Sequence, residues 1–427
     1  MLYTQLWKQL FIGTQILFTL CFAISCGSST AGSTYYIDGA AGSDDNTGTA
    51  ESSPWLTLAH VSGTTFQPGD SILFKRGSTY SGCVTINGDG TAKNPITISA
   101  YGTGDAPSFT NPNVDDNTGN AMRIRGDYQI VENLYFHHTA PAKDKVGFVE
   151  VWAVGALHVS LGNDHVIIRN NEFAYNAKAI QSHSEYSLIT YNNIHEGNPD
   201  QSNGFLSAPY WGPIGIHIGI GNQEISYNTI ANMYVDGGEW GGDGGAIELD
   251  DGRNHKDNIQ IHHNSTLHNM GFMEVSWSDD IAKVASNNIN IHHNVSRDYQ
   301  GFVLWWAPTL NSTITNNTII RTDNEFYGPF DGVFFFDPQP AIVTITKNII
   351  VSDNDLTKMV YVEDFDGGVN DLIHENNCYW DMEDGKVDLH LELGPGEITA
   401  EPLFIDFEGG DYHLLPNSPA AGWGAME

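Results

Sequence analysis

An asparagine recurs along most of this chain in one local setting, preceded by an apolar residue and two mostly polar residues and followed by another strand-forming segment. The anchors of this repeat are Asn133, Asn171, Asn192, Asn228, Asn264, Asn294, Asn317, Asn348 and Asn376. They lie 38, 21, 36, 36, 30, 23, 31 and 28 residues apart. Variable spacing above a minimum near 21 is typical of a solenoid, in which each coil has a constant core and loops of free length.

A coil of three short strands accounts for the shortest spacing. Coils stack at the strand spacing of roughly 4.8 Å, so that identical side chains line up along the axis. A buried asparagine can then bond its amide to the asparagines above and below. A β-propeller would need about 40 to 45 residues per blade at a nearly constant period. We therefore predict an all-β fold over residues 26–427, a single-stranded right-handed parallel β-helix with loop insertions.

Both ends of this region carry distinctive segments. SSPWLTLAHV predicts a short N-terminal capping helix, followed by the turn PGD and the strand SILFKRG. Together with NPITISAYG and the closing EPLFIDFEGGDYHLLPNSPAAGWG at 401–424, these segments resemble secreted right-handed β-helix proteins. That superfamily includes pectate lyases, polygalacturonases and related glycosidases. The resemblance implies the fold and a carbohydrate ligand, but it leaves hydrolase, lyase, epimerase and non-enzymatic adhesin open.

The first 25 residues have the layout of a secretory signal peptide, with Lys8, an apolar run and small residues before Cys26. The run AISC resembles a bacterial lipobox, which would make Cys26 a lipid-bearing N-terminus and anchor the protein to the outer membrane; ordinary cleavage is the alternative. A membrane-spanning anchor is less favoured because the apolar run is short and interrupted. We predict a bacterial protein that is secreted or held at the cell surface.

The charge balance limits the partners. The chain has 18 Lys and Arg against 52 Asp and Glu, a net charge of −34. Such a surface repels the phosphates of nucleic acid and disfavours anionic lipid. Solubility explains the acidity, and Ca²⁺ sites are the specific alternative. We expect a polysaccharide or oligosaccharide partner and no required cofactor, with Ca²⁺ as the metal ion that acidic residues could hold.

Alternation along the strand before each anchor separates a core face from an outward face. The predicted core residues are Ile180, Ile216, Ile218, Ile247, Leu249, Met273, Val275, Val303 and Trp305. The first outward column contains Arg123, His158, Gln181, His217, Glu248, Glu274, Leu304 and Phe335. The second contains Arg125, Ser160, His183, Gly219, Asp250, Ser276, Trp306 and Asp337.

This register brings three carboxyl groups together, and we predict that Glu248, Asp250 and Glu274 are catalytic. Carboxyl groups so near one another cannot all ionise easily, so the pKa of one should rise while the pKa of another stays low. The first can then act as a general acid and the second as a nucleophile or base. Two alternatives remain open. The carboxylates are simply solvated on an open face, or a Ca²⁺ site forms from Asp243, Glu248, Asp250 and Asp251.

Residues around the carboxyl groups suit sugar binding. The predicted substrate-binding residues are His183, His217, Trp240, Trp277, Trp306, Asp337 and Arg253. Aromatic faces beside carboxylates suit pyranose rings, although a tryptophan packed under a loop is an equal alternative for Trp277. A lone histidine is more often structural. The histidine doublets are His137-His138, His262-His263 and His292-His293. Two of them share the repeat position of Tyr191, Tyr227 and Lys347, so we interpret the doublets as a surface ladder on the asparagine strand rather than as metal ligands.

Of the reactions left open, we predict glycoside hydrolysis with retention. Retaining enzymes hold their two carboxyl groups about 5 to 5.5 Å apart, near the step between coils. Glu274 would be the acid/base and Asp250 or Glu248 the nucleophile, an arrangement similar to that of β-helical xylosidases. A Ca²⁺-dependent polysaccharide lyase acting on a uronate polymer is the runner-up, with Arg253, Lys178 and Lys283 as its candidate cations. A non-catalytic sugar-binding β-helix is the third reading.

Overall fold

The structure is a computed structural model. It describes residues 32–111, 120–139, 154–197, 212–236, 242–250, 254–275, 285–323, 332–336, 341–353, 359–363, 371–383, 385, 389 and 391–426. Among these residues no helix is long and apolar enough to cross a membrane. The predicted signal peptide and Cys26 lie outside the described ranges, so that prediction stays open.

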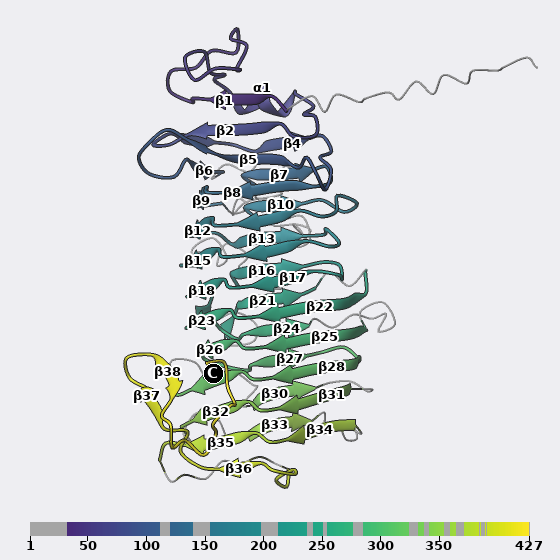
Figure 1. Ribbon diagram of the computed structural model, residues 1–427, viewed down its shortest axis with the longest axis vertical. Helices are drawn as coiled ribbons and strands as arrows, with labels where there is room; N and C mark the ends of the chain where they lie inside the picture. The colour runs from purple at the N-terminus through teal and green to yellow at the C-terminus, as the bar shows by residue number, and fades with distance from the viewer. Residues whose placement is uncertain are drawn as a thin grey trace, which may run out of the picture. The chain divides into compact units, whose positions relative to one another are not determined.

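Gly32–Glu427 form one unit built from three long parallel sheets (Figure 1). Sheet A contains β1 (Thr34–Ile37), β2 (Ser71–Lys75), β5 (Ile96–Tyr101), β8 (Gln129–Glu132), β11 (Ile167–Arg169), β14 (Leu188–Thr190), β17 (Glu224–Ser226), β22 (Lys256–His262), β25 (Ser286–His292), β28 (Thr309–Thr315), β31 (Ala341–Thr346) and β34 (Asp371–Glu375). Sheet B contains β4 (Val84–Asn87), β7 (Met122–Arg125), β10 (Leu157–Val159), β13 (Lys178–Ser182), β16 (Ile214–Ile218), β21 (Gly245–Leu249), β24 (Met273–Val275), β27 (Val303–Trp305), β30 (Gly332–Phe336) and β33 (Met359–Glu363). Sheet C contains β3 (Thr79–Ser81), β6 (Ser108–Thr110), β9 (Tyr135–His137), β12 (Glu172–Ala174), β15 (Asn193–His195), β18 (Thr229–Ala231), β23 (Ser265–Leu267), β26 (Val295–Arg297), β29 (Thr318–Arg321), β32 (Ile349–Ser352), β35 (Cys378–Asp381) and β36 (Ile398–Thr399).

Each coil contributes one strand to each sheet, as β13, β14 and β15 do before β16, β17 and β18 repeat the order. The predicted parallel β-helix is therefore confirmed. Apolar side chains from all three sheets fill one continuous core, and every core residue predicted on sheet B is buried. Burial of these side chains is the main source of stability, because three- to seven-residue strands cannot persist alone.

The asparagine ladder runs through the core-facing corner between sheets A and C. Asn228 is typical: its Nδ2 donates to Asn264 Oδ1 at 3.0 Å and to Ile189 O at 2.9 Å, while its backbone N–H also donates to Asn264 Oδ1. The residue before each ladder asparagine adopts a left-handed conformation, as Tyr227 does at φ 55°. The ladder satisfies the backbone groups that this sharp corner would otherwise leave unpaired.

Two of the nine predicted anchors are wrong by one residue. Asn133 and Asn376 occupy the left-handed position, with φ 62° and 54°. The ladder position itself is Leu134 in the first case and Asn377 in the second. Asparagine tolerates the left-handed region better than most residues, so two adjacent positions of the corner accept it.

The remaining elements lie near the ends and beside sheet B. The predicted N-terminal helix is α1 (Leu58–Ser62), capped by Thr57 and holding Val61 in the core. The hairpin of β37 (Phe404–Asp406) and β38 (Asp411–Leu414) packs with Tyr412 against the outer side of sheet C, where a second apolar cluster forms (Figure 1). The short pair of β19 (Val235–Asp236) and β20 (Gly242–Asp243) directly precedes β21.

Candidate active site

The outward column of sheet B has the register predicted from alternation. Gln181 pairs with His217, His217 with Glu248, Glu248 with Glu274, and Glu274 with Leu304. The column continues to Phe335 at one end and to His158 and Arg123 at the other. Since parallel strands in register place paired side chains directly above one another, Glu248 and Glu274 are neighbours across one rung.

The second column supplies Asp250, which follows β21. Its backbone N–H donates to Ile218 O at 3.1 Å, so the ladder continues for one more residue and Asp250 shares the outward face with Glu248. His217 Nε2 lies 3.5 Å from Asp250 Oδ2. Ligand-type atoms of His217, Glu248 and Asp250 all lie within 4.8 Å of one another. The three predicted carboxyl groups therefore come from two adjacent rungs, as expected.

The prediction of an open face is wrong for part of the column. His183 and His217 are buried, and so are Leu304 and Phe335 on the C-terminal side of the cluster. Glu248, Asp250 and Glu274 are half-buried. Alternation determines which side of the sheet a residue faces, but side chains packed over that side determine whether water reaches it. The carboxyl groups are thus partly withdrawn from water rather than fully exposed.

Partial burial changes the ionisation of these acids. Burial and the neighbouring Glu274 carboxylate raise the pKa of Glu248 well above its ordinary value. Burial and the charges of Asp243 and Asp250 raise the pKa of Glu274 to about 8. A half-buried cluster of like charges is destabilised unless protons are retained, so the Glu248–Glu274 pair holds at least one proton near neutral pH. The cluster can therefore supply a proton donor and a carboxylate at the same time.

Asp243 belongs to the same electrostatic cluster and was not among the predicted catalytic residues. It lies on β20, and its Oδ1 accepts the Gly244 N–H at 2.6 Å. Burial raises its pKa to about 6. The sequence signal was an acidic, Gly-rich insertion directly before β21, from which we predicted Asp243 only as a ligand of the alternative Ca²⁺ site.

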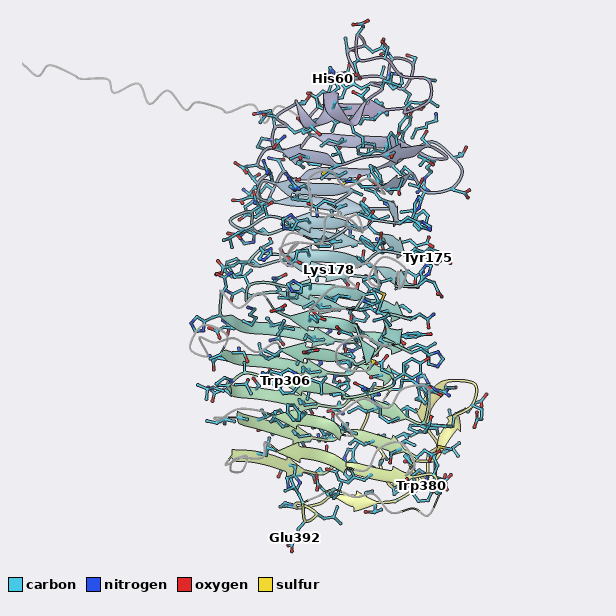
Figure 2. All side chains as sticks on the ribbon, turned by 180° about the vertical axis from the view of Figure 1, so that it is seen from behind. His60, Tyr175, Lys178, Trp306, Trp380 and Glu392 are labelled. Carbon is cyan, nitrogen blue, oxygen red and sulfur yellow. The ribbon has the colours of Figure 1, made fainter. Side chains whose placement is uncertain are left out.

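Trp306 borders the carboxyl groups on the next coil. Its indole N–H donates a hydrogen bond to Glu274 and opposes the rise of that residue's pKa. The ring is half-buried and contacts Phe335, with centroids 4.5 Å apart. Figure 2 labels Trp306 and Lys178, the two residues that lie on either side of the cluster along sheet B. Trp306 therefore combines an aromatic face with a direct contact to the acid.

Four of the predicted substrate-binding residues cannot be placed. Trp240, Trp277, Asp337 and Arg253 lie outside the described residues, as does Asp251 of the alternative Ca²⁺ site. His183 and His217 are placed beside the cluster but are too buried to present a broad surface to a sugar. Three of the seven predicted residues are described, and among these three only Trp306 has a ring that is partly accessible to solvent.

Sequence reasoning missed the polar residues behind His217. Lys178 is fully buried, and its Nζ donates to Gln181 Oε1 at 3.1 Å. Gln181 Nε2 is in turn hydrogen-bonded to His217 Nδ1. A lysine at the first position of a short apolar strand was the available signal, but we considered it only as a lyase cation.

The donor set fits Ca²⁺ poorly. Ca²⁺ takes six to eight oxygen ligands. Among the described residues, the group with metal-ligand spacing contains one buried imidazole beside two carboxylates. The Lys178 ammonium also acts on both Glu248 and His217.

Two of the three histidine doublets form the predicted surface ladder, whereas His137 and His138, at the end of β9 in sheet C, stack on Tyr135 and Tyr175 instead. His262 stacks on His292 with centroids 4.8 Å apart, and His263 stacks on His293 at 5.0 Å. Tyr227 continues the second stack at 4.8 Å from His263. Their nitrogens bond within each doublet, so they are already partnered.

Comparisons with known structures agree with a parallel β-helix fold, and no family model matches the chain. Pectate lyase Pel9A aligns over 92% of each chain with 14% identity and a TM-score of 0.56. A complex of XylC with xylose aligns over 86% of each chain with 12% identity and a TM-score of 0.51. At these identities the likeness establishes the fold alone.

A sequence relative is the lacto-N-biosidase of Bifidobacterium longum subsp. longum. It is 42% identical over 82 residues, which is 18% of this chain and 5% of the relative. The chain thus aligns with a small part of that much longer protein. The match therefore relates one segment of this chain to a small part of a glycosidase sequence.

Proposed function

We propose that this protein is a glycoside hydrolase that cleaves an oligosaccharide or polysaccharide with carboxyl groups from adjacent coils. The observation that carries the proposal is the pairing of Glu248 with Glu274 across one rung, beside an Asp250 that faces the His217 ring. The partial sequence match to a lacto-N-biosidase supports the same reaction class.

Glycoside hydrolysis requires one protonated carboxyl group and one carboxylate on either side of the scissile bond. We assign Glu274 as the acid/base, because its raised pKa of about 8 keeps the proton at neutral pH. We assign Asp250 as the nucleophile, because it faces the His217 Nε2 atom, whereas the pKa of Glu248 is raised by burial and by Glu274. Of the two nucleophiles that the sequence left open, Asp250 is therefore favoured.

The reaction then proceeds in two displacements. Asp250 attacks the anomeric carbon while Glu274 gives its proton to the departing glycosidic oxygen. The Glu274 carboxylate next takes a proton from water, whose oxygen attacks the glycosyl ester and releases Asp250. Asp250 lies two residues beyond Glu248 on the same rung, so Asp250 and Glu274 are diagonal neighbours rather than a directly paired set. Their backbone separation of roughly 7 to 8 Å does not select the retaining geometry, and the product anomer is the test of retention.

Asp243 is a second candidate for the acid. Its raised pKa of about 6 lies between those of an ordinary carboxyl group and Glu274, which suits proton transfer near neutral pH. Asp243 lies on β20, outside the stacked rungs of sheet B. It would therefore approach a bound sugar from a different side than Glu274 does.

The test uses aryl glycosides, including a lacto-N-bioside and a xyloside, and the variants Asp250→Asn, Glu274→Gln and Asp243→Asn. Loss of the nucleophile should abolish turnover of every substrate. Loss of the acid should leave turnover of substrates with a good leaving group largely unchanged. Added azide should restore turnover of this variant, with a glycosyl azide as the product. Glu408→Gln, an exposed glutamate on the β37–β38 hairpin, is the matched control. Unchanged turnover in Asp250→Asn would refute the assignment, and an inverted product anomer would refute retention.

A polysaccharide lyase is the second candidate, favoured by the likeness to Pel9A. A lyase needs a cation against the uronate carboxylate, but Lys178 is fully buried against Gln181. An unsaturated, ultraviolet-absorbing product from pectate or alginate would establish the lyase and overturn the hydrolase.

We also propose export with a lipid on Cys26. Fatty-acid labelling that disappears in Cys26→Ser, with the protein released from the membrane fraction, would support the anchor. Release of wild-type protein into the medium would instead indicate ordinary cleavage.

A further inference from the structure

The buried polar chain behind the carboxyl groups assigns a role to two residues that do not reach a substrate. It begins at Lys178 Nζ, 3.1 Å from Gln181 Oε1, and continues from Gln181 Nε2 to His217 Nδ1. It ends at His217 Nε2, 3.5 Å from Asp250 Oδ2. Lys178, Gln181 and His217 are all fully buried.

The direction of donation along this chain follows from its first member. A lysine ammonium donates hydrogen bonds and accepts none, so the Gln181 oxygen must face Lys178. The amide N–H₂ of Gln181 then faces His217 Nδ1, which must accept. A neutral imidazole has one donor and one acceptor, so the ring proton of His217 lies on Nε2 and points toward Asp250.

We propose that Lys178 and Gln181 are positioning residues that fix the Nε2–H tautomer of His217, and that this tautomer holds Asp250 oriented as a carboxylate. The kinetic part of this proposal rests on the proposed function, in which Asp250 is the nucleophile. The opposite tautomer would set the Nε2 lone pair against the carboxylate oxygen and favour a protonated, inactive Asp250.

The surroundings of His217 keep the ring neutral. Burial and the Lys178 charge lower its pKa to about 3. The charged or titratable groups that face it or Asp250 are Lys178 and His183 from the β13 side, Glu248 on β21, Glu274 on β24 and Asp243 on β20. A neutral donor holds Asp250 without becoming an acid itself over the working pH range.

The same geometry disfavours a metal ion at His217, Glu248 and Asp250. A metal needs the Nε2 lone pair, which requires the proton on Nδ1 and the Gln181 oxygen turned toward it. The Gln181 N–H₂ would then face the Lys178 ammonium, donor against donor. The chain therefore selects hydrogen bonding over metal binding at this imidazole.

The tautomer can be measured without any activity. In ¹⁵N-labelled protein, the ring nitrogens of His217, assigned by their loss in His217→Gln, should show a protonated Nε2 and an unprotonated Nδ1. Gln181→Met should mix or reverse the two tautomers. A protonated Nδ1 in the wild-type protein, or an unchanged tautomer in Gln181→Met, would overturn the proposal. This result stands or fails separately from the glycosidase assignment.

Kinetics test the consequence for Asp250. Gln181→Met should lower kcat by roughly 10-fold to 100-fold, the usual range for a residue that orients a functional side chain. It should also move the acidic limb of the kcat/KM profile to higher pH, because Asp250 ionises less readily. In the His217→Gln variant the side-chain amide replaces the imidazole, so there is no tautomer for Gln181 to select. Adding Gln181→Met to this variant should therefore have little further effect on kcat. Gln223→Met is the control and should retain full activity; Gln223 is a buried glutamine directly before β17 and donates to Ile220 O.

Two kinetic outcomes would contradict the positioning role. One is an equal loss from Gln181→Met in both backgrounds, which would indicate a packing role. The other is an acidic limb that does not move. The melting temperatures of all variants should stay close to that of Gln223→Met, which would show that a loss of activity does not come from a loss of folded protein.

Discussion

At the scale of single residues, Glu274 carries a measurable cost to stability. Below the unfolded pKa of about 4.3 the group is protonated in both states. As pH rises from there toward the folded pKa of about 8, the unfolded state loses the proton and the folded state keeps it, so the free energy of unfolding falls. Glu274→Gln should therefore be as stable as wild type at pH 4 and more stable by on the order of 1 to 3 kcal/mol at pH 7.5. Urea titration at both pH values measures this, and a pH-independent difference would contradict it.

Trp306 should tune the same acid. Trp306→Phe keeps an aromatic face but removes the indole N–H that bonds Glu274. Since that bond favours the charged carboxylate, its loss should raise the pKa of Glu274 further and shift the alkaline limb of activity to higher pH. A pH–rate profile is the measurement, with Trp380→Phe on the distant β35 as the control. A shift to lower pH would show that the bond does not stabilise the ionised form.

At the scale of elements, the asparagine ladder couples successive coils from Asn171 to Asn377. Asn264→Ala would remove the acceptor for the Asn228 backbone N–H and Nδ2, and the donor to Ile225 O. Buried groups left without partners each cost about 1 to 3 kcal/mol, so we expect a loss of at least about 3 kcal/mol by chemical denaturation. Asn193→Ala, on the exposed face of β15, should change stability by less than about 0.5 kcal/mol. Equal effects of the two substitutions would show that the ladder hydrogen bonds make no net contribution to the free energy of unfolding.

The order of strands along the chain determines which residues meet. Residues 217, 248 and 274 come from β16, β21 and β24, which are consecutive rungs of sheet B although long insertions separate them in sequence. The sequence was enough to predict this column, because period-two alternation and the repeat define each rung. It was not enough to predict burial, since Leu304 and Phe335 are buried although they belong to the outward column.

At the scale of the whole molecule, the net charge of −34 opposes folding through self-repulsion. Salt screens charges within about 10 Å at 0.1 M, so the melting temperature should rise as NaCl increases from roughly 0.05 to 0.5 M. Glucose, which does not screen charge, serves as the comparison at matched osmolality. A melting temperature that falls with NaCl would mean that attractive ion pairs such as Arg297–Asp323 outweigh the repulsion.

The sequence by itself determined the coil, the core face and the carboxyl column, because these follow from local periodicity and from repetition. The sequence also predicted asparagine at the coil corner. Two of the predicted anchors were one residue too early, because the preceding left-handed position accepts asparagine as well. Only the tertiary structure decided which outward residues are withdrawn from water, that Asp243 joins the cluster, and that Lys178 and Gln181 orient His217. Those features depend on distances between side chains of different coils and on the dielectric around them, and neither is encoded in a pattern of neighbours along the chain.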